Sequence, residues 1–248
     1  MLYEAIFPLT FSEPIPIRPD MGSIFQGALM EIIDNDDART LHAMQLRPYT
    51  QSVMYDHARR QGVWRITTLN PYGYSAVLEK ILAYDKPLYL KQRHVAVSLG
   101  TPVIRQTTYE ALGDAIFQAP QGPRIVNVTM RTATTFKHDN MYDILPSVER
   151  CYGSLLAKWN TFSTTSTLEQ AGLAADLSQY CRLVKYHLDS QVFGLEGIRI
   201  NGFVGTMRLR FSGNDMVRRL QGLLWAFAPY SGLGIKTAMG MGAVEVAD

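Results

Sequence analysis

The chain has 248 residues, of which 47% are hydrophobic and 19% are charged, and its formal net charge is +2. This length suits one large domain or two domains of roughly 110 to 130 residues, each able to bury a core. A net charge this small does not by itself indicate a nucleic-acid partner. No apolar run approaches the roughly 20 residues that a membrane span needs, and the first residues lack the pattern of a secretion signal. We therefore expect a cytoplasmic protein without membrane contact.

The first half of the chain alternates between strand and helix patterns. Residues 2–10 alternate like a strand, and residues 24–33 space their apolar side chains as a helix does. Further elements are expected as a short helix capped at Asn35 and reaching about Gln45, a strand at 63–69, a helix at 74–84, and a strand at 87–97 that carries Lys91, Arg93 and His94. We read this order as strand, helix, strand, strand, helix, strand.

The second half follows a segment rich in proline and glycine at 118–123, the best candidate for a linker. The elements expected after it are a strand at 124–135, helices at 147–159 and 168–180, strands at 182–188 and 198–211, a helix at 215–228 and a short strand at 243–246. This pattern repeats that of the first half. The sequence therefore predicts an α+β fold of two tandem ferredoxin-like (βαββαβ) domains, residues 1–117 and 118–248, facing each other across a central cleft.

A glycine-rich run at 231–242 is the most unusual local feature. It holds Gly232, Gly234, Gly240 and Gly242 around a single cation, Lys236. Glycine permits positive φ angles and close backbone approach, so such a run can form an anion-binding loop or simply a turn. It is not a Walker A loop, because Ile235 precedes the lysine, and Thr237 stands where the dinucleotide fingerprint needs its third glycine.

Two motifs in the same order carry a resemblance to a known family. The first is Phe25–Met30 followed by Leu41-His42 and by Arg47–Thr50, and the second is Trp225–Ala228 followed by the glycine run. Together with the strand end at 134–137, they resemble the CRISPR repeat-RNA processing endoribonucleases of the RAMP superfamily, most closely the enzymes that serve type III systems. The resemblance covers most of the chain.

The resemblance implies a cut without metal or cofactor, in which a ribose 2′-OH attacks its own phosphate and leaves a 2′,3′-cyclic phosphate and a 5′-OH. His42 matches the family's catalytic histidine, and imidazole suits proton transfer near neutral pH. Arg47 aligns with a catalytic lysine and is suited to hold the scissile phosphate. Met30 stands where several relatives place a catalytic tyrosine. Read from its neighbours alone, His42 would be a partly buried helix histidine.

The same reasoning gives a set of candidate RNA contacts. Arg208 and Arg210 share one face of their strand because side chains alternate with a period of two. The full set of candidates is Gly232, Gly234, Lys236, Thr237, Gly240, Gly242, Lys137, Arg208 and Arg210. The partners implied are CRISPR repeat RNA, a multisubunit type III effector complex in transient contact, and a second copy in a homodimer.

Two other functions stay open at this point. A noncatalytic RAMP subunit that keeps guide RNA bound would explain Met30 as a loss of the reaction. A small anionic metabolite held at the glycine run would require no RNA affinity. Cys151 and Cys181 are expected as buried reduced thiols, and Tyr152, Trp159, Phe162, Trp225 and Phe227 as core residues.

Overall fold

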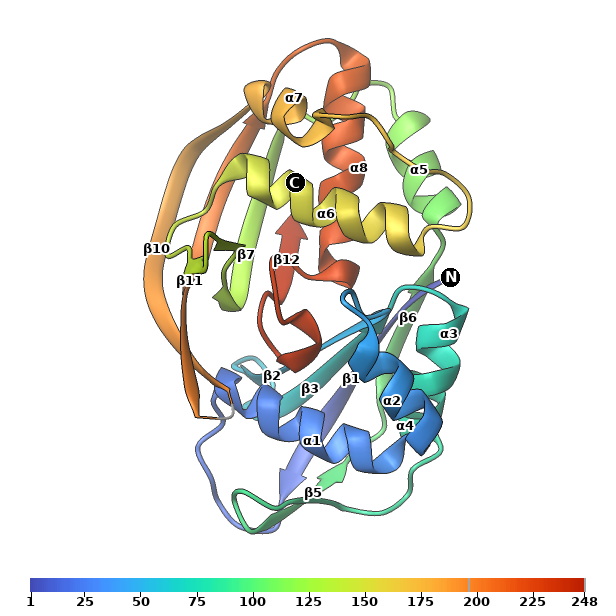
Figure 1. Ribbon diagram of the computed structural model, residues 1–248, viewed down its shortest axis with the longest axis vertical. Coiled ribbons are helices and arrows are strands. Elements are labelled where there is room, and N and C mark those ends of the chain that lie inside the picture. The colour runs from blue at the N-terminus through green and yellow to red at the C-terminus, as the bar shows by residue number, and fades with distance from the viewer. Residues whose placement is uncertain (196, 248) are drawn as a thin grey trace.

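The computed structural model describes residues 1–195 and 197–247. The chain folds into two main antiparallel sheets, each covered on one face by helices (Figure 1). We call the first sheet with α1 to α4 the first half, and the second sheet with α5 to α8 the second half. The predicted α+β class is confirmed.

The first sheet is built around the long strand β1. Its order is β2-β3-β1-β5-β4, and β6 pairs with the beginning of β1. The bounds are β1 (Leu2–Phe11), β2 (Tyr49–Asp56), β3 (Gln61–Thr68), β4 (Leu88–Leu90), β5 (Val95–Leu99) and β6 (Val103–Thr107). Alternate β1 residues such as Phe7 point into a core with Phe25 and Trp64, whose rings lie 5.1 Å apart.

Helices cover one face of this sheet. They are η1 (Pro19–Met21), α1 (Gly22–Ile32), α2 (Asn35–Ala43), α3 (Pro71–Gly73), the π-helical turn η2 (Tyr74–Leu78) and α4 (Glu79–Leu82). The apolar side of α1 is buried through Phe25 and Leu29, as the helical spacing predicts. α2 buries only Leu41 and leaves its other face in solvent.

The second sheet has the order β10-β11-β7-β12. Its strands are β7 (Ile125–Thr134), β10 (Cys181–Leu195), β11 (Ile198–Phe211) and β12 (Val244–Ala247), with a separate small hairpin of β8 (Lys137–His138) and β9 (Met141–Tyr142). Its helices are α5 (Tyr109–Phe117), α6 (Val148–Phe162), α7 (Leu173–Gln179) and α8 (Asp215–Ser231), and η3 (Thr237–Met239) follows in the glycine run.

Aromatic side chains fill the core of the second half. Tyr152, Trp159, Phe162, Trp225 and Phe227 are all buried, which confirms them as core residues. The thiols of Cys151 and Cys181 are free and buried, and burial raises the pKa of Cys181 to about 11. None of the helices in the described residues has the length and apolar composition of a membrane-spanning helix.

The end of α8 joins the two halves. Arg65 of the first sheet donates through Nε to Glu4 (2.5 Å) and through Nη2 to the carbonyl of Pro229 (2.7 Å). Thr67, on the same strand, donates to the carbonyl of Tyr230 (2.5 Å). The last turn of α8 is therefore held by side chains of the first sheet, directly before the glycine run begins.

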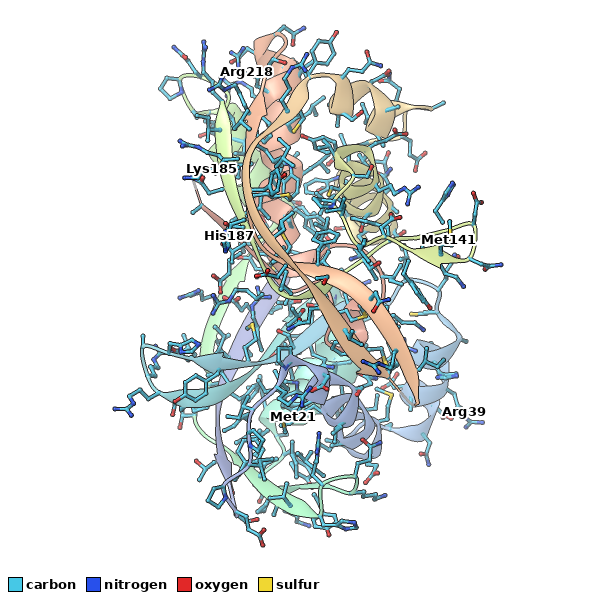
Figure 2. All side chains as sticks on the ribbon, turned by 90° about the vertical axis from the view of Figure 1, so that its left-hand side faces the viewer. Met21, Arg39, Met141, Lys185, His187 and Arg218 are labelled. Atoms are coloured by element: carbon cyan, nitrogen blue, oxygen red, sulfur yellow. The ribbon has the colours of Figure 1, made fainter. Side chains whose placement is uncertain are left out.

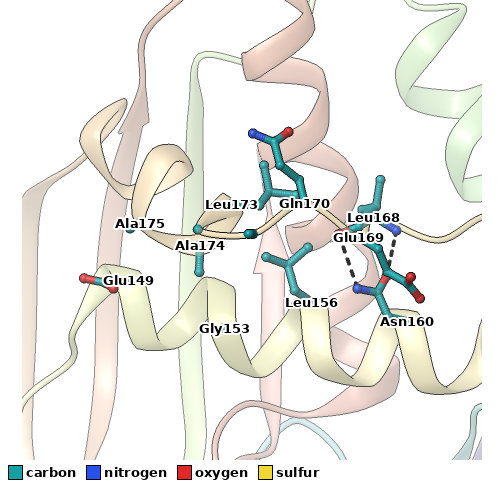
Figure 3. A pocket seen from close by; sticks show the side chains of 12 residues that line it. Glu149, Gly153, Leu156, Asn160, Leu168, Glu169, Gln170, Leu173, Ala174 and Ala175 are labelled. Carbon is teal, nitrogen blue, oxygen red and sulfur yellow. Dashed lines mark hydrogen bonds between the residues drawn. The ribbon is translucent and has the colours of Figure 1, made fainter.

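Several elements differ from the sequence prediction. Lys91, Arg93 and His94 lie in the turn between β4 and β5 and not in a strand, and α2 has Asp34 in place of Asn35 at its N-cap. The helix predicted at 168–180 begins only at Leu173, because the Asn160 side chain binds the backbone of Leu168 and Gly172 has a φ of +77° (Figure 3). The sequence pattern missed β2, β6 and α5.

Candidate functional site

His42 lies on the last turn of α2. Asp36 and Asp37 in the first turn and His42 in the last complement the helix dipole, so the local sequence favours a helix at this place. The His42 side chain is exposed, whereas the preceding Leu41 is fully buried. The imidazole is therefore accessible to a large ligand, which corrects the partly buried position expected from its neighbours alone.

A surface hollow between α1 and α2 contains His42. Its lining residues are Met30, Asn35, Ala38, Arg39, His42 and Ala43. Met30 comes from α1 and is half-buried. The structure thus places Met30 and His42 at one hollow. A tyrosine at the position of Met30 would therefore lie at the same hollow as the histidine, as joint action of the two residues requires.

Arg47 connects the end of α2 with the glycine run. Its Nε donates to the carbonyl of Leu41 at 3.0 Å, and its Nη1 lies 3.4 Å from the sulfur of Met239. The guanidinium is half-buried, so it is held between these two segments. Arg47 and Met239, which are 192 positions apart in the sequence, therefore meet close to Leu41, the residue before His42.

Tyr49 and Gln51, on β2, make hydrogen bonds to the segments that surround this junction. Gln26 donates to the buried Tyr49 hydroxyl at 2.8 Å, and burial raises the Tyr49 pKa against the opposing charge of Arg47. Gln51 donates to the carbonyls of Gly22 (2.7 Å) and Ala238 (3.1 Å), and accepts from Trp64 Nε1 (2.9 Å). Sequence reasoning missed Gln51, which stands between the polar Thr50 and Ser52 and therefore shows no apolar alternation.

The glycine run needs its glycines. The φ angles of Gly232, Gly234, Gly240 and Gly242 are +63°, +78°, +107° and +67°, and that of Lys236 is +56°. All four glycines lie in the region that side chains rarely adopt. At Gly240 an added Cβ would come within 2.8 Å of the Gly22 Cα, so the run packs directly on the start of α1.

Most backbone amides of the run bond within the protein. The N–H of Leu233 donates to Gly242, that of Gly242 to Ala133, that of Ile235 to Thr135, and that of Gly234 to the hydroxyl of Ser154. These amides point to partners inside the protein, so they are not free to bind a ligand. The exposed side chain of Lys236 is the charge that the run offers to solvent.

Arg208 and Arg210 lie elsewhere. Both are exposed on β11, on the face opposite to the buried Met207 and Leu209, and so away from the helices. Arg208 pairs across the strands with Lys185 and Arg210 with Arg182, which gives this face four cations. Figure 2 shows Lys185 and His187 in the upper half of the molecule and Arg39 of α2 in the lower half.

Lys137 lies at the base of the β8–β9 hairpin and is exposed. The hairpin adjoins the glycine run, because the carbonyl of Thr135 accepts from Ile235. Lys137 therefore follows, by two residues, a position that is hydrogen-bonded to the glycine run. Among the described residues, no group of three or more histidine, cysteine or acidic side chains has the spacing of a metal site.

The comparisons with known proteins agree on one family. The family model for the CRISPR-associated endoribonuclease Cas6 matches residues 128–244. The Cas6 protein of Streptococcus thermophilus is 24% identical over 231 residues, covering 92% of this chain and 91% of that relative. The Cas6 protein of Mycobacterium tuberculosis H37Rv is 28% identical over 228 residues, covering 91% of this chain and 71% of that relative. The family that the chain matches in every one of these comparisons is Cas6.

Solved Cas6 structures have the same fold. A Cas6 product complex superposes with a TM-score of 0.81 at 20% identity, covering all of both chains. Thermus thermophilus Cas6 superposes with a TM-score of 0.75 at 20% identity, covering 100% of this chain and 98% of that one. The predicted resemblance to the CRISPR repeat-RNA processing endoribonucleases is confirmed. His42 and Arg47 lie outside residues 128–244 matched by the Cas6 family model, so their roles stay predictions.

Proposed function

We propose that this Cas6-family chain is an endoribonuclease that binds CRISPR precursor RNA and cuts it within each repeat. The observation that carries the proposal is the contact of Arg47 with both Leu41 and Met239. It brings an exposed imidazole, a guanidinium and the exposed lysine of the glycine run to one region of the surface. Such a set can handle protons and phosphate charge together.

The proposed reaction is an internal phosphoryl transfer. The 2′-oxygen next to the cut attacks phosphorus, and the bond from phosphorus to the 5′-oxygen breaks. The 2′-OH loses a proton and the departing 5′-oxygen gains one, which leaves a 2′,3′-cyclic phosphate and a 5′-OH without any metal. His42 moves one of these protons, and Arg47 stabilises the charge on the phosphorane. Arg47 cannot supply the second proton, because an arginine stays protonated.

RNA would be held on two surfaces. The exposed Lys236 supplies the charge of the glycine run, whereas Thr237, which lies against Gly232 and Gly242, shapes the run together with Gly232, Gly234, Gly240 and Gly242. Lys137 flanks it. Arg208 and Arg210, together with their neighbours on β10, would contact phosphates farther along the RNA, and their contribution would fall as salt rises.

The strand orders suggest the architecture behind this function. We interpret the two sheets as tandem ferredoxin-like domains facing across a central cleft, with a boundary near residues 117–118. α5 lies before that boundary but packs on the second half, with the Tyr109 ring 4.9 Å from that of Trp159. A homodimer and transient contact with a multisubunit type III effector complex, in the cytoplasm, complete the proposal.

A second function is favoured by one observation. Met30 lies in the hollow of His42, and a thioether can neither donate nor accept the second proton of the reaction. A noncatalytic subunit that binds guide RNA would tolerate this residue. A small anionic metabolite as ligand has less support, because the amides of the glycine run bond within the protein.

The test is cleavage of labelled repeat RNA from the source organism's CRISPR locus, in the presence of EDTA. The wild type, His42→Ala and a matched His57→Ala variant are compared, and a second RNA carries a 2′-deoxy sugar at the cut site. His57 is an exposed histidine in the turn between β2 and β3, away from the hollow of His42. We expect a metal-free cut by the wild type and by His57→Ala. The cut should be lost with His42→Ala, by at least about 100-fold, and with the 2′-deoxy RNA.

Each other outcome has a distinct meaning. Tight binding of the repeat RNA by the wild type without a cut would favour the guide-binding subunit. A cut that persists with His42→Ala would overturn the site. A cut of the 2′-deoxy RNA would overturn the mechanism.

A further inference from the structure

Lys158 is a buried ammonium group in the second half, and the proposed reaction leaves it without a role. It lies on α6, and only 4% of the residue is exposed. Its Nζ donates to the carbonyls of Ser231 at 2.9 Å and Gly232 at 3.0 Å. Burial lowers the Lys158 pKa to about 7, and within residues 1–195 and 197–247 no carboxylate pairs with the ammonium group. A buried cation of this kind costs free energy unless its hydrogen bonds are made.

The two carbonyls mark the passage from α8 into the glycine run. Ser231 is the last residue of α8 and Gly232 is its C-cap. Carbonyls at a helix C-terminus lack intrahelical partners and carry the negative end of the helix dipole, so a cation is favourable there. Since Arg65 and Thr67 bind the carbonyls of Pro229 and Tyr230, four consecutive carbonyls have side-chain partners.

α6 also holds the next residues of the run. Ser154 lies one helical turn before Lys158, on the same face of α6, and its hydroxyl accepts from the Gly234 amide at 3.0 Å. Between these two contacts lies Leu233, whose side chain is fully buried. The chain beyond Gly234 then leads to the exposed Lys236. One face of α6 thus holds the first residues of the glycine run, 231–234, which we call its base.

We infer that Lys158 is a positioning residue, which fixes the base of the glycine run so that the exposed Lys236 faces bound RNA. This inference rests on the proposed function. Lys158 lies beneath the run and touches no RNA itself. Its effect is therefore on how tightly RNA binds, and the chemical step at His42 stays unchanged once RNA is bound.

A purely structural role would give a different result. It would reduce the fraction of folded protein, whereas each folded molecule would bind RNA as before. The matched control is Leu156→Ala, on the same helix. Leu156 is buried, and Figure 3 shows it pointing toward the segment that carries Leu173. This variant should lose about 2 to 5 kcal/mol of stability.

The experiment measures binding and chemistry separately at a temperature where every variant is folded. Filter binding uses repeat RNA with a 2′-deoxy sugar at the cut site, and single-turnover cleavage uses saturating unmodified RNA. For Lys158→Met we expect the Kd to rise about tenfold, and the saturated cleavage rate to stay within about twofold. Leu156→Ala should keep the wild-type Kd. Lys158→Met combined with Lys236→Ala should bind about as weakly as the weaker single variant, because both act through one loop.

Hydrogen exchange supplies a readout without RNA. The amides of Leu233 and Gly242 close the base of the run, and they should exchange faster in Lys158→Met than in the wild type. Wild-type Kd or unchanged amide exchange in Lys158→Met would overturn the inference while the proposed function stands. Additive losses in the double variant would overturn it too. A wild type that binds no repeat RNA would overturn the proposed function. It would also overturn the role of Lys158 in RNA binding.

Discussion

The end of α2 and the glycine run meet at Arg47 but are built in opposite ways. His42 is exposed, and Leu41 alone among the α2 residues is buried. In the run, by contrast, Gly232, Gly240 and Gly242 are buried, and the backbone bonds to β7 and α6. One region presents reactive side chains on a surface, and the other presents a backbone shape fixed by the interior.

This difference separates chemistry from shape. Substitutions at the α2 end should change the rate of the reaction and leave the fold almost intact, because few core contacts depend on it. Substitutions in the run should change the fold locally before they change any rate. The measurements below test whether the two regions can be separated in this way.

Arg47 contacts both regions, so its substitution is the strictest test of whether they can be separated. We expect Arg47→Ala to lower single-turnover cleavage by about 100-fold to 1,000-fold, because the phosphorane loses its charged hydrogen-bond donor. Arg47→Lys should recover part of the rate, since lysine keeps the charge but not the paired donors. The measurement is cleavage at saturating RNA with urea unfolding as the stability control. Wild-type rate in Arg47→Ala, or a large loss of stability with the rate, would break the separation.

Gly242→Ala tests the shape of the run. An added Cβ would lie 2.0 Å from the Leu233 carbonyl, at a φ of +67°. We expect about 2 to 4 kcal/mol of lost stability, combining the left-handed strain with the steric displacement. RNA binding should weaken at temperatures where the variant remains folded. Urea unfolding and filter binding measure the two effects.

Gly27→Ala is the matched control for that substitution. Gly27 lies in α1, and an added Cβ would meet nothing within 4 Å. Alanine in a helix interior should therefore stabilise the protein by up to about 1 kcal/mol. If Gly242→Ala were as harmless as Gly27→Ala, the run would not be the rigid element described above.

The sequence predicts most long elements because their burial follows a simple period. It fails at β2, where Thr50, Gln51 and Ser52 are all buried. Gln51 is satisfied by the carbonyls of Gly22 and Ala238 and by the Trp64 indole, and those partners come from three separate segments. A polar residue buried by such partners leaves no alternation to detect.

In the candidate site, too, local features can be predicted from the sequence and contacts between distant segments cannot. The need for glycine at Gly232, Gly234, Gly240 and Gly242 can be read from composition alone, and their positive φ angles confirm it. The meeting of Arg47 with Met239 could not be read, because it depends on how the two halves pack. The burial of Lys158 could not be read either, since nothing local distinguishes a lysine on a helix that is buried from one that is exposed.

Lys158 also predicts a dependence of stability on pH. Its pKa is lowered to about 7 in the folded protein, against an ordinary value of 10.5. Between these values the unfolded chain binds the proton and the folded chain does not, so the free energy of unfolding rises with pH by up to about 1.4 kcal/mol per unit. Below pH 7 lysine is charged in both states, and the full cost of its burial is present.

Urea unfolding at pH 6.5, 7.5 and 8.5 should therefore show the wild type gaining stability relative to Lys158→Met as the pH rises. The comparison with the variant matters, because the buried thiols act in the opposite direction. The pKa of Cys181 is raised to about 11, so the unfolded thiol ionises first and stability falls toward alkaline pH in both proteins. That contribution cancels in the difference. A difference that stays flat across this range would mean that Lys158 remains charged, so that an ammonium group and not a neutral amine binds the two carbonyls at each of these pH values.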